Sequence, residues 1–348
     1  MKKIKILAIV VVIGVILLFT PGFVLNSAIV NTASNKESVK PTTNNPTEKD
    51  TIIELAGLQM PVLKGGLFDR YHSNSPMDVI AKERPDIDLS WFKTIQKEKK
   101  EVGFTTYSPN FYYSNSSITA IYTADMGKIK ELIPNEVKDL VKPISYTPGR
   151  GLIAITSYAY HYCDNDLYNE LSISIVTTKP GKNNWGLISL MGELNDKNLW
   201  GYVLKLPVNT ELARVRGFVG YNLPKWLIPI DYTNDGDNLT FNYYDEKGNF
   251  DFSMAGKKLD VSASKPEITR SNFINLDKQG QLTHGYTDVR SIKKASSKSA
   301  GDIQLNLSDG PLSTFIKSLG LKKLVKYDYQ PEFQAALYTP ELVQDEKK

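Results

Sequence analysis

Alternating hydrophobic and polar positions dominate the middle of the chain and predict strands rather than helices. Residues 152–162 (LIAITSYAYHY) and 167–178 (LYNELSISIVTT) alternate with a period of two, and the polar residues CDND lie between them. This pattern is typical of a β-hairpin in which one face of each strand is buried. The same kind of evidence predicts further strands at residues 117–123, 185–193, 199–206, 227–231, 239–244, 249–254, 258–261, 282–293, 323–329 and 332–337.

Helical spacing is confined to short segments, which are residues 91–99, 125–132, 210–219 and 311–319. Asp125 can cap the second segment, and Asn209 or Thr210 the third, because their side-chain oxygens accept hydrogen bonds from free N–H groups. Pro134 and Pro224 then end these two helices. Many strands with few short helices predict an α+β or barrel-like domain rather than a doubly wound parallel sheet.

The first 30 residues are predicted to lie outside the globular domain. Lys2, Lys3 and Lys5 precede a run that stays mostly apolar as far as Leu25, and about 20 such residues are enough to span a bilayer. Either a cleaved signal peptide or an uncleaved transmembrane anchor fits this pattern. The basic flank predicts a domain outside the cytoplasm, held by one N-terminal helix or, after cleavage, secreted or periplasmic.

The rest of the chain divides by composition. Residues 31–50 (NTASNKESVKPTTNNPTEKD) are polar and are predicted to be a disordered linker. Residues 51–106 are interrupted by proline and glycine, and we expect them to form an N-terminal extension that packs on the main domain. That domain is predicted to span residues 107–340, and a charged tail follows at 341–348.

Composition and motifs exclude several classes of function. The net charge of +4 is spread over 348 residues without a basic block, so nucleic acid is not a predicted partner. Cys163 is the single cysteine, which excludes an intrachain disulfide and a cysteine zinc cluster. The three histidines lack ligand spacing, and hydrolase, NTPase and metalloprotease motifs are missing, so neither a metal nor a cofactor is predicted.

Four segments in this order resemble the acetoacetate decarboxylase superfamily over roughly residues 107–340. They are IYTADMGKIKELIP (121–134), LYNELSISI (167–175), ELARVRGFVGYNLPKW (211–226) and INLDKQGQLTHGYTDVR (274–290). The second resembles the family's Y-x-E strand, which carries an active-site glutamate, and the third resembles the helix that leads into its P-K-K loop. The resemblance implies a closed β-barrel or cone with surrounding strands, a few short helices and a buried lysine.

The resemblance also implies catalytic roles for Lys225 and Glu170. Lys225 stands where the family forms a Schiff base, and a protonated imine can accept the electrons left behind when a 3-oxo acid loses carbon dioxide. A lysine amine must be neutral to attack, which burial among apolar neighbours such as Leu223 and Leu227 favours. Glu170 shares one strand face with Tyr168, and it would handle protons if that face points into the barrel.

The chain departs from the family's pattern at several positions. Trp226 replaces the second lysine of P-K-K, and Phe218 and Val219 replace an arginine and a glutamate after the helix glycine. A further family arginine falls near Asn115. The candidate residues of the substrate pocket are Tyr168, Trp226, Phe218 and Asn115. Arg214 and Arg216 lie two apart and cannot share a helix face. A surface position is predicted for them, and the alternative is that one of them points toward a carboxylate in the pocket.

Two functions fit these observations. The first is a carboxy-lyase-like enzyme that forms a Schiff base between Lys225 and a 3-oxo acid or related keto acid, with Glu170 assisting proton transfer; aldol and dehydration chemistry stay open. The second is a non-catalytic barrel that binds a hydrophobic small molecule at the cell surface, with Lys225 as a counter-charge. The predicted partners are therefore one of these small molecules and, through the N-terminal segment, a membrane. Assembly into a homo-oligomer stays open.

Overall fold

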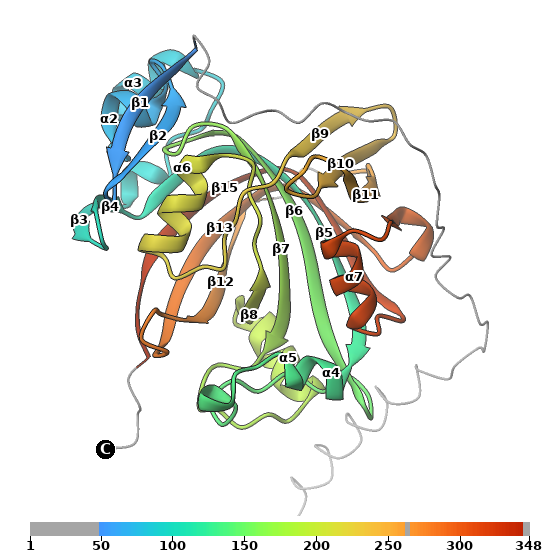
Figure 1. The fold of residues 1–348 in the computed structure, drawn as a ribbon. Helices are drawn as coiled ribbons and strands as arrows, with labels where there is room; N and C mark the ends of the chain where they lie inside the picture. Colours follow the sequence, from blue (N-terminus) through green and yellow to red (C-terminus); the bar gives the residue numbers. More distant parts are fainter. Residues whose placement is uncertain (1–48, 262–264, 344–348) are drawn as a thin grey trace, which may run out of the picture.

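A closed barrel of seven strands forms the centre of the computed structural model, which describes residues 49–261 and 265–343 (Figure 1). In order around the barrel, the strands are β12 (Glu267–Leu276), β13 (Leu282–Ser297), β15 (Leu324–Leu342), β5 (Asn110–Asp125), β6 (Arg150–Cys163), β7 (Tyr168–Thr177) and β8 (Asn198–Lys205). Neighbouring strands are antiparallel except β12 and β8, which close the barrel in parallel. The α+β fold with a closed β-barrel is confirmed.

A second sheet and short helices surround the barrel. The sheet contains β14 (Ile303–Leu307), β11 (Phe250–Lys257), β10 (Asn238–Tyr244) and β9 (Ile230–Asp235), in that order. The helices are α2 (Leu67–Tyr71), α3 (Met77–Glu83), α4 (Met126–Glu131), α5 (Leu187–Asn195), α6 (Glu211–Val215) and α7 (Pro311–Ser318). Figure 1 places this sheet and α7 against one side of the barrel.

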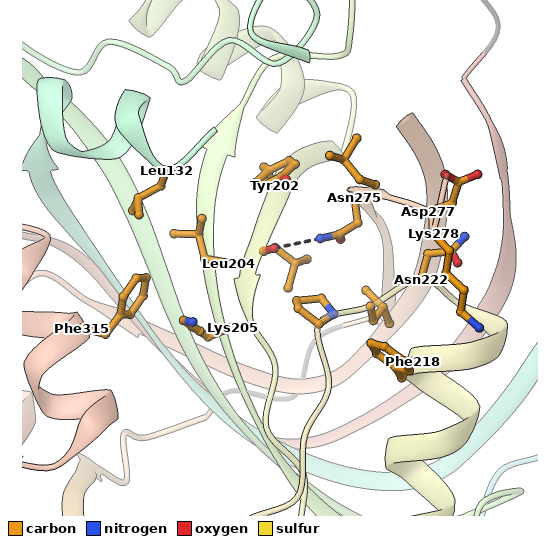
Figure 2. A pocket seen from close by; sticks show the side chains of 14 residues that line it. Leu132, Tyr202, Leu204, Lys205, Phe218, Asn222, Asn275, Asp277, Lys278 and Phe315 are labelled. Atoms are coloured by element: carbon orange, nitrogen blue, oxygen red, sulfur yellow. Dashed lines mark hydrogen bonds between the residues drawn. The ribbon is translucent and has the colours of Figure 1, made fainter. Parts of the chain in front are cut away.

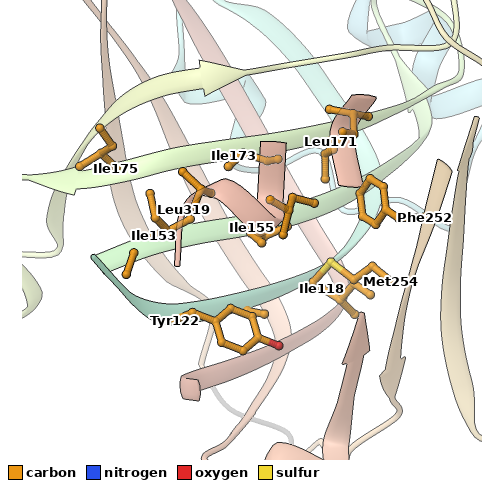
Figure 3. Packing of buried hydrophobic residues seen from close by; sticks show 14 of the residues in the cluster. Ile118, Tyr122, Ile153, Ile155, Leu171, Ile173, Ile175, Phe252, Met254 and Leu319 are labelled. Carbon is orange, nitrogen blue, oxygen red and sulfur yellow. The ribbon is translucent and has the colours of Figure 1, made fainter. Parts of the chain in front are cut away.

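The largest hydrophobic core lies between the barrel wall and this second layer. Fully buried side chains of β6 and β7, among them Ile155 and Ile173, join Phe252 and Met254 of β11 in one cluster (Figure 3). Helices α4 and α7 add Ile129 and further apolar residues to the same cluster. Apolar side chains therefore pack against the outer face of the barrel wall, and a second, smaller buried cluster that includes Tyr160 and Tyr168 lies on the opposite face.

Period-two alternation divides the side chains of β7 between these two environments. Leu171, Ile173 and Ile175 belong to the outer core. Glu170 is buried on the opposite face, where Tyr158 of β6 is its partner in the strand register. A slip of one residue would reverse every side chain, so the hydrophobic pattern fixes this register.

The N-terminal extension packs on the barrel through two apolar clusters. A hairpin of β1 (Asp50–Leu55) and β2 (Leu58–Leu63) contributes Met60, which packs with Phe68 of α2 and Leu212 of α6. Further along, Phe92 packs against Phe111 of β5. The pair β3 (Glu98–Glu101) and β4 (Thr105–Ser108) then leads into β5.

Several predicted elements are present as expected. The side chain of Asp125 accepts a hydrogen bond from the Lys128 amide and caps α4, and Thr210 caps α6 through the Ala213 amide. Strands β6 and β7 form the predicted hairpin. The two strands predicted at 323–329 and 332–337 are one strand, β15, because an irregular register between Gln330 and Phe333 accommodates the intervening proline.

Other predictions of secondary structure were wrong. Residues 187–193 form most of helix α5 rather than part of a strand, since Leu187, Met191 and Leu194 recur at the spacing of helical turns. The segment 91–99 holds only a short 3₁₀ turn at Phe92–Thr94 before β3 begins. No strand forms at 258–261, and β11 ends just before this segment, at Lys257.

The predicted signal peptide or membrane anchor, residues 1–30, lies outside the described residues. So do residues 31–48 of the predicted linker and residues 344–348 of the predicted charged tail. Within the part of the chain that the structure describes, no helix is both long enough and apolar enough to cross a bilayer.

Asp166 joins the turn between β6 and β7 to the N-terminal extension, and its ionisation should affect stability. Its carboxylate accepts a hydrogen bond from the Phe68 amide at 3.3 Å. Burial raises the pKa of Asp166 to about 6, although the backbone amides of α2 oppose this rise. The folded state therefore holds the proton more tightly than the unfolded chain, and stability is lost as the pH rises from about 4 to about 6.

We expect Asp166→Asn to be more stable than the wild type above pH 6, by on the order of 1–2 kcal/mol. Asparagine keeps an acceptor oxygen for the amide and tolerates the backbone φ of 59° at this position. Urea unfolding at pH 4 and pH 7.5 measures the effect, which should vanish at the lower pH. Asp309→Asn, at a fully exposed side chain, is the matched control; equal responses of the two variants would contradict the assignment.

Candidate functional site

A buried ion pair joins Lys225 to Glu170 inside the barrel. The Nζ of Lys225 donates to Oε2 of Glu170 at 2.5 Å, and the two side chains are only 5% and 8% exposed. The second carboxylate oxygen, Oε1, accepts a hydrogen bond from the hydroxyl of Tyr160 at 3.2 Å. The structure thus brings together the two residues that the resemblance implied, although they are 55 positions apart in the sequence.

A short extended segment around Val208 holds these two residues side by side. Val208 forms an antiparallel bridge to Glu170 and a parallel bridge to Leu227. Its amide donates to the carbonyl of Trp226 at 3.0 Å, and its carbonyl accepts from Ile228 at 3.0 Å. The loop is therefore fastened to β7 directly after Lys225, through backbone hydrogen bonds on both sides of Leu227.

Gly217 determines how closely the chain approaches Lys225. After α6 the chain widens into one π-helical turn, Arg216–Gly220, a distortion that is frequent at functional sites. A Cβ added to Gly217 would lie 2.2 Å from Cδ and 2.5 Å from Cε of Lys225. Real atoms do not approach so closely, so this position requires glycine for its lack of a side chain rather than for its backbone freedom.

Tyrosine rings enclose the ion pair. The ring centroids of Tyr112 and Tyr160 lie 4.6 Å apart, as do those of Tyr160 and Tyr168. The Nζ of Lys225 lies 5.4 Å from the Tyr168 ring centroid, a cation–π distance. Burial is the main cause that raises the pKa of all three hydroxyls well above the usual value, and the charge of Glu170 adds to it. The hydroxyls therefore stay protonated and can donate hydrogen bonds.

A second buried polar cluster lies beneath the N-terminal extension. Lys97 Nζ donates to Asp164 at 2.5 Å, and Asp164 also accepts from the hydroxyl of Tyr113 at 3.0 Å. Burial lowers the pKa of Lys97, and the charge of Asp164 opposes this change. Lys97 is thus a second buried lysine, which the sequence analysis did not single out because its partner is far away in the chain.

Arg216 is almost completely buried, so the predicted surface position was wrong. Its Nη2 donates to Thr106 at 2.9 Å, and Phe68 covers the guanidinium with its ring centroid 5.1 Å away. Among the described residues, Nε and Nη1 have no hydrogen-bond partner. Arg214 does lie closer to the surface, where it pairs with Glu211. The extension residues that bury Arg216 carried no sequence signal of this contact.

The structure separates the four candidate pocket residues. Tyr168 lines the ion pair, and Asn115 pairs with Tyr160 across the strands while its Nδ2 donates to the carbonyls of Tyr112 and Phe333. Trp226 instead packs against the outer core. Phe218 is 47% exposed and lines a different pocket. Side chains alternate along the loop, so Trp226 points to the opposite side of the loop from Lys225.

Comparisons with known proteins agree with this architecture. No family model and no curated protein matches the sequence. Among solved structures, acetoacetate decarboxylase from Legionella pneumophila has a TM-score of 0.51 and 12% identity, covering 69% of this chain and 89% of that one. The enduracididine biosynthesis enzyme MppR complexed with pyruvate has a TM-score of 0.50 and 13% identity, covering 68% and 91%.

A third structure, MppR complexed with the condensation product of pyruvate and imidazole 4-carboxaldehyde, has a TM-score of 0.50 and 12% identity, covering 69% and 91%. At such identities the likeness is one of fold. The resemblance noted in the sequence is confirmed at that level: the chain has the fold of acetoacetate decarboxylase and its structural relatives.

Proposed function

We propose that the chain is an enzyme that condenses Lys225 with the carbonyl group of a small keto acid and uses Glu170 to move protons. The observation that carries this proposal is the buried contact between Lys225 and Glu170 at 2.5 Å. A buried ion pair is often less stabilising than apolar residues of similar volume, so its presence needs another reason. The similarity to a structure that binds pyruvate, a keto acid, supports the choice of substrate class.

In the proposed mechanism, each residue of the pair has a role. Glu170 Oε2 takes a proton from the Lys225 ammonium, which leaves a neutral amine to attack the carbonyl carbon. The resulting carbinolamine then loses its hydroxyl as water when Glu170 returns a proton to it. The sum is one ammonium and one ketone giving one protonated imine and one water, with Glu170 returned to its carboxylate form. Tyr160 holds Oε1 and so keeps the carboxylate oriented during both transfers.

Arg216 supports an anionic substrate. Its guanidinium has two nitrogens without a partner among the described residues, in a site from which water is largely excluded. A buried cation of this kind is costly unless it is paired. It belongs to the same turn as Gly217, which contacts Lys225 directly. We infer that a substrate carboxylate is a suitable partner for Arg216.

Trapping with borohydride tests the proposal. Incubation with pyruvate or acetoacetate and borohydride is expected to leave a stable mass adduct on the peptide that contains Lys225. Lys225→Arg should abolish the adduct, since guanidinium stays protonated and cannot attack. Carbon dioxide release from acetoacetate, measured separately, would distinguish decarboxylation from other imine chemistry.

Lys97→Arg is the matched control, because Lys97 is also a buried lysine in an ion pair; it should leave the adduct unchanged once folding is verified by circular dichroism. An adduct that persists in Lys225→Arg and disappears in Lys97→Arg would move the chemistry to the second cluster. Reversible binding of apolar ligands without any adduct would instead support a binding barrel.

A further inference from the structure

A pocket opens where the barrel wall is incomplete between β8 and β12. The two strands pair from Asn198 and Arg270 up to Tyr202 and Ile274, and the ladder ends there. Beyond this point, a side chain replaces the backbone contact, since Asn275 Nδ2 donates to the carbonyl of Val203 at 2.9 Å. The pocket at this gap has a volume of about 460 Å³ (Figure 2), which is within the range of sites for small organic ligands.

Segments that are far apart in the sequence form its walls. Figure 2 shows Leu132, Leu204 and Phe315 grouped at one end, beside Lys205. At the other end lie Phe218 and Lys278. The walls are therefore mainly apolar, and an ammonium group is present at each end.

Neither ammonium group has an ion-pair partner among the described residues. Lys205 Nζ lies 5.0 Å from the ring centroid of Phe315 and 5.7 Å from that of Trp226. Lys278 Nζ lies 5.9 Å from the ring of Phe218. The carboxylate of Asp277 in the same pocket accepts hydrogen bonds from backbone amides of its own turn at 2.9 and 2.8 Å. Two lysines and one aspartate line the pocket, so its charged groups have an excess of one positive charge.

We propose that this pocket binds an amphipathic carboxylate, with its carboxylate on Lys205 and its hydrocarbon part against Leu204 and Phe315. A charge-assisted contact with Lys205 fixes the head group, and the apolar walls bury the rest. Lys278 lies at the opposite end and acts at longer range, by attracting the anion. This site is separate from the Lys225–Glu170 pair, since neither residue lines it.

Titration with sodium decanoate, followed by calorimetry and by the fluorescence of Trp226 close to Lys205, tests the proposal. Saturable binding is expected. Lys205→Met should weaken it roughly 10-fold or more, because the charged contact is lost. Lys278→Met should weaken it less, with an effect that declines as salt screens the charge. Lys64→Met, at an exposed lysine in the N-terminal extension, should bind as the wild type does.

Two further measurements separate the possible results. Decanol, which has the same chain without the charge, should bind more weakly than decanoate; equal affinity would overturn the assignment of Lys205. Lys225→Arg should bind decanoate normally, because Lys225 lies outside the pocket. Failure of borohydride trapping would then leave this proposal standing, and absence of decanoate binding to the wild type would overturn this proposal alone.

Discussion

Replacing Glu170 with leucine is expected to lower the free energy of unfolding by about 3–5 kcal/mol near neutral pH. The change leaves the Lys225 ammonium buried without its counter-charge, in a site where the lysine side chain is only 5% exposed. Removing one partner of a buried ion pair is far more costly than the net contribution of the pair itself. Urea unfolding monitored by fluorescence measures the loss.

The double variant Glu170→Leu with Lys225→Met decides whether this cost comes from an unpaired charge. It should recover most of the lost stability, since apolar residues of similar volume often replace a buried pair at little cost. Glu211→Leu provides the control, because Glu211 pairs with Arg214 nearer the surface and such a pair contributes about 0–1 kcal/mol. A double variant that is as unstable as the single one would show that packing, rather than charge, sets the cost.

Gly217→Ala should nearly abolish the trapping of a keto acid on Lys225 and destabilise the protein by about 1–3 kcal/mol. The new methyl group would lie 2.2 Å from Cδ of Lys225. The lysine cannot move aside freely, because its Nζ is held by Glu170 at 2.5 Å. To avoid the methyl group, the Lys225 side chain would have to break its contact with Glu170. The ammonium would then lack the carboxylate that accepts its proton before the amine attacks. Adduct mass and urea unfolding give the two readouts.

Gly192→Ala is the matched control for this prediction. Gly192 lies in α5, and a Cβ there would meet nothing within 4 Å, so alanine should be neutral or stabilise the helix by up to about 1 kcal/mol. Its trapped adduct should equal that of the wild type. If Gly217→Ala retained full trapping and full stability, the close approach between Gly217 and Lys225 would be contradicted.

Local patterns in the sequence determined much of the barrel. The alternation in β6 and β7 predicts a hairpin, and the structure confirms it, because the strand period is short and one face must be buried. The helix caps at Asp125 and Thr210 were also predicted from the sequence, since a cap depends on residues only three positions apart. The same approach failed at α5, where a short apolar run fits either period.

Local sequence patterns predicted the site only in part. The resemblance pointed to Lys225 and Glu170, but their contact depends on Val208, which bridges two segments that are distant in sequence. Trp226 and Phe218 were expected near Lys225 and lie elsewhere. Trp226 follows Lys225 in an extended loop, where adjacent side chains point to opposite sides, and Phe218 projects from the π-helical turn into another pocket.

The sequence by itself determined which strands alternate, where two helices begin and which lysine follows Pro224. The tertiary structure alone decided that Arg216 is buried, because Phe68 covers it from an extension whose own pattern is irregular. It also decided that the gap between β8 and β12 holds a pocket, since barrel closure depends on the pairing of strands about 70 residues apart. Short-range periodicity specifies the faces of an element, whereas burial and charge pairing depend on which distant elements meet.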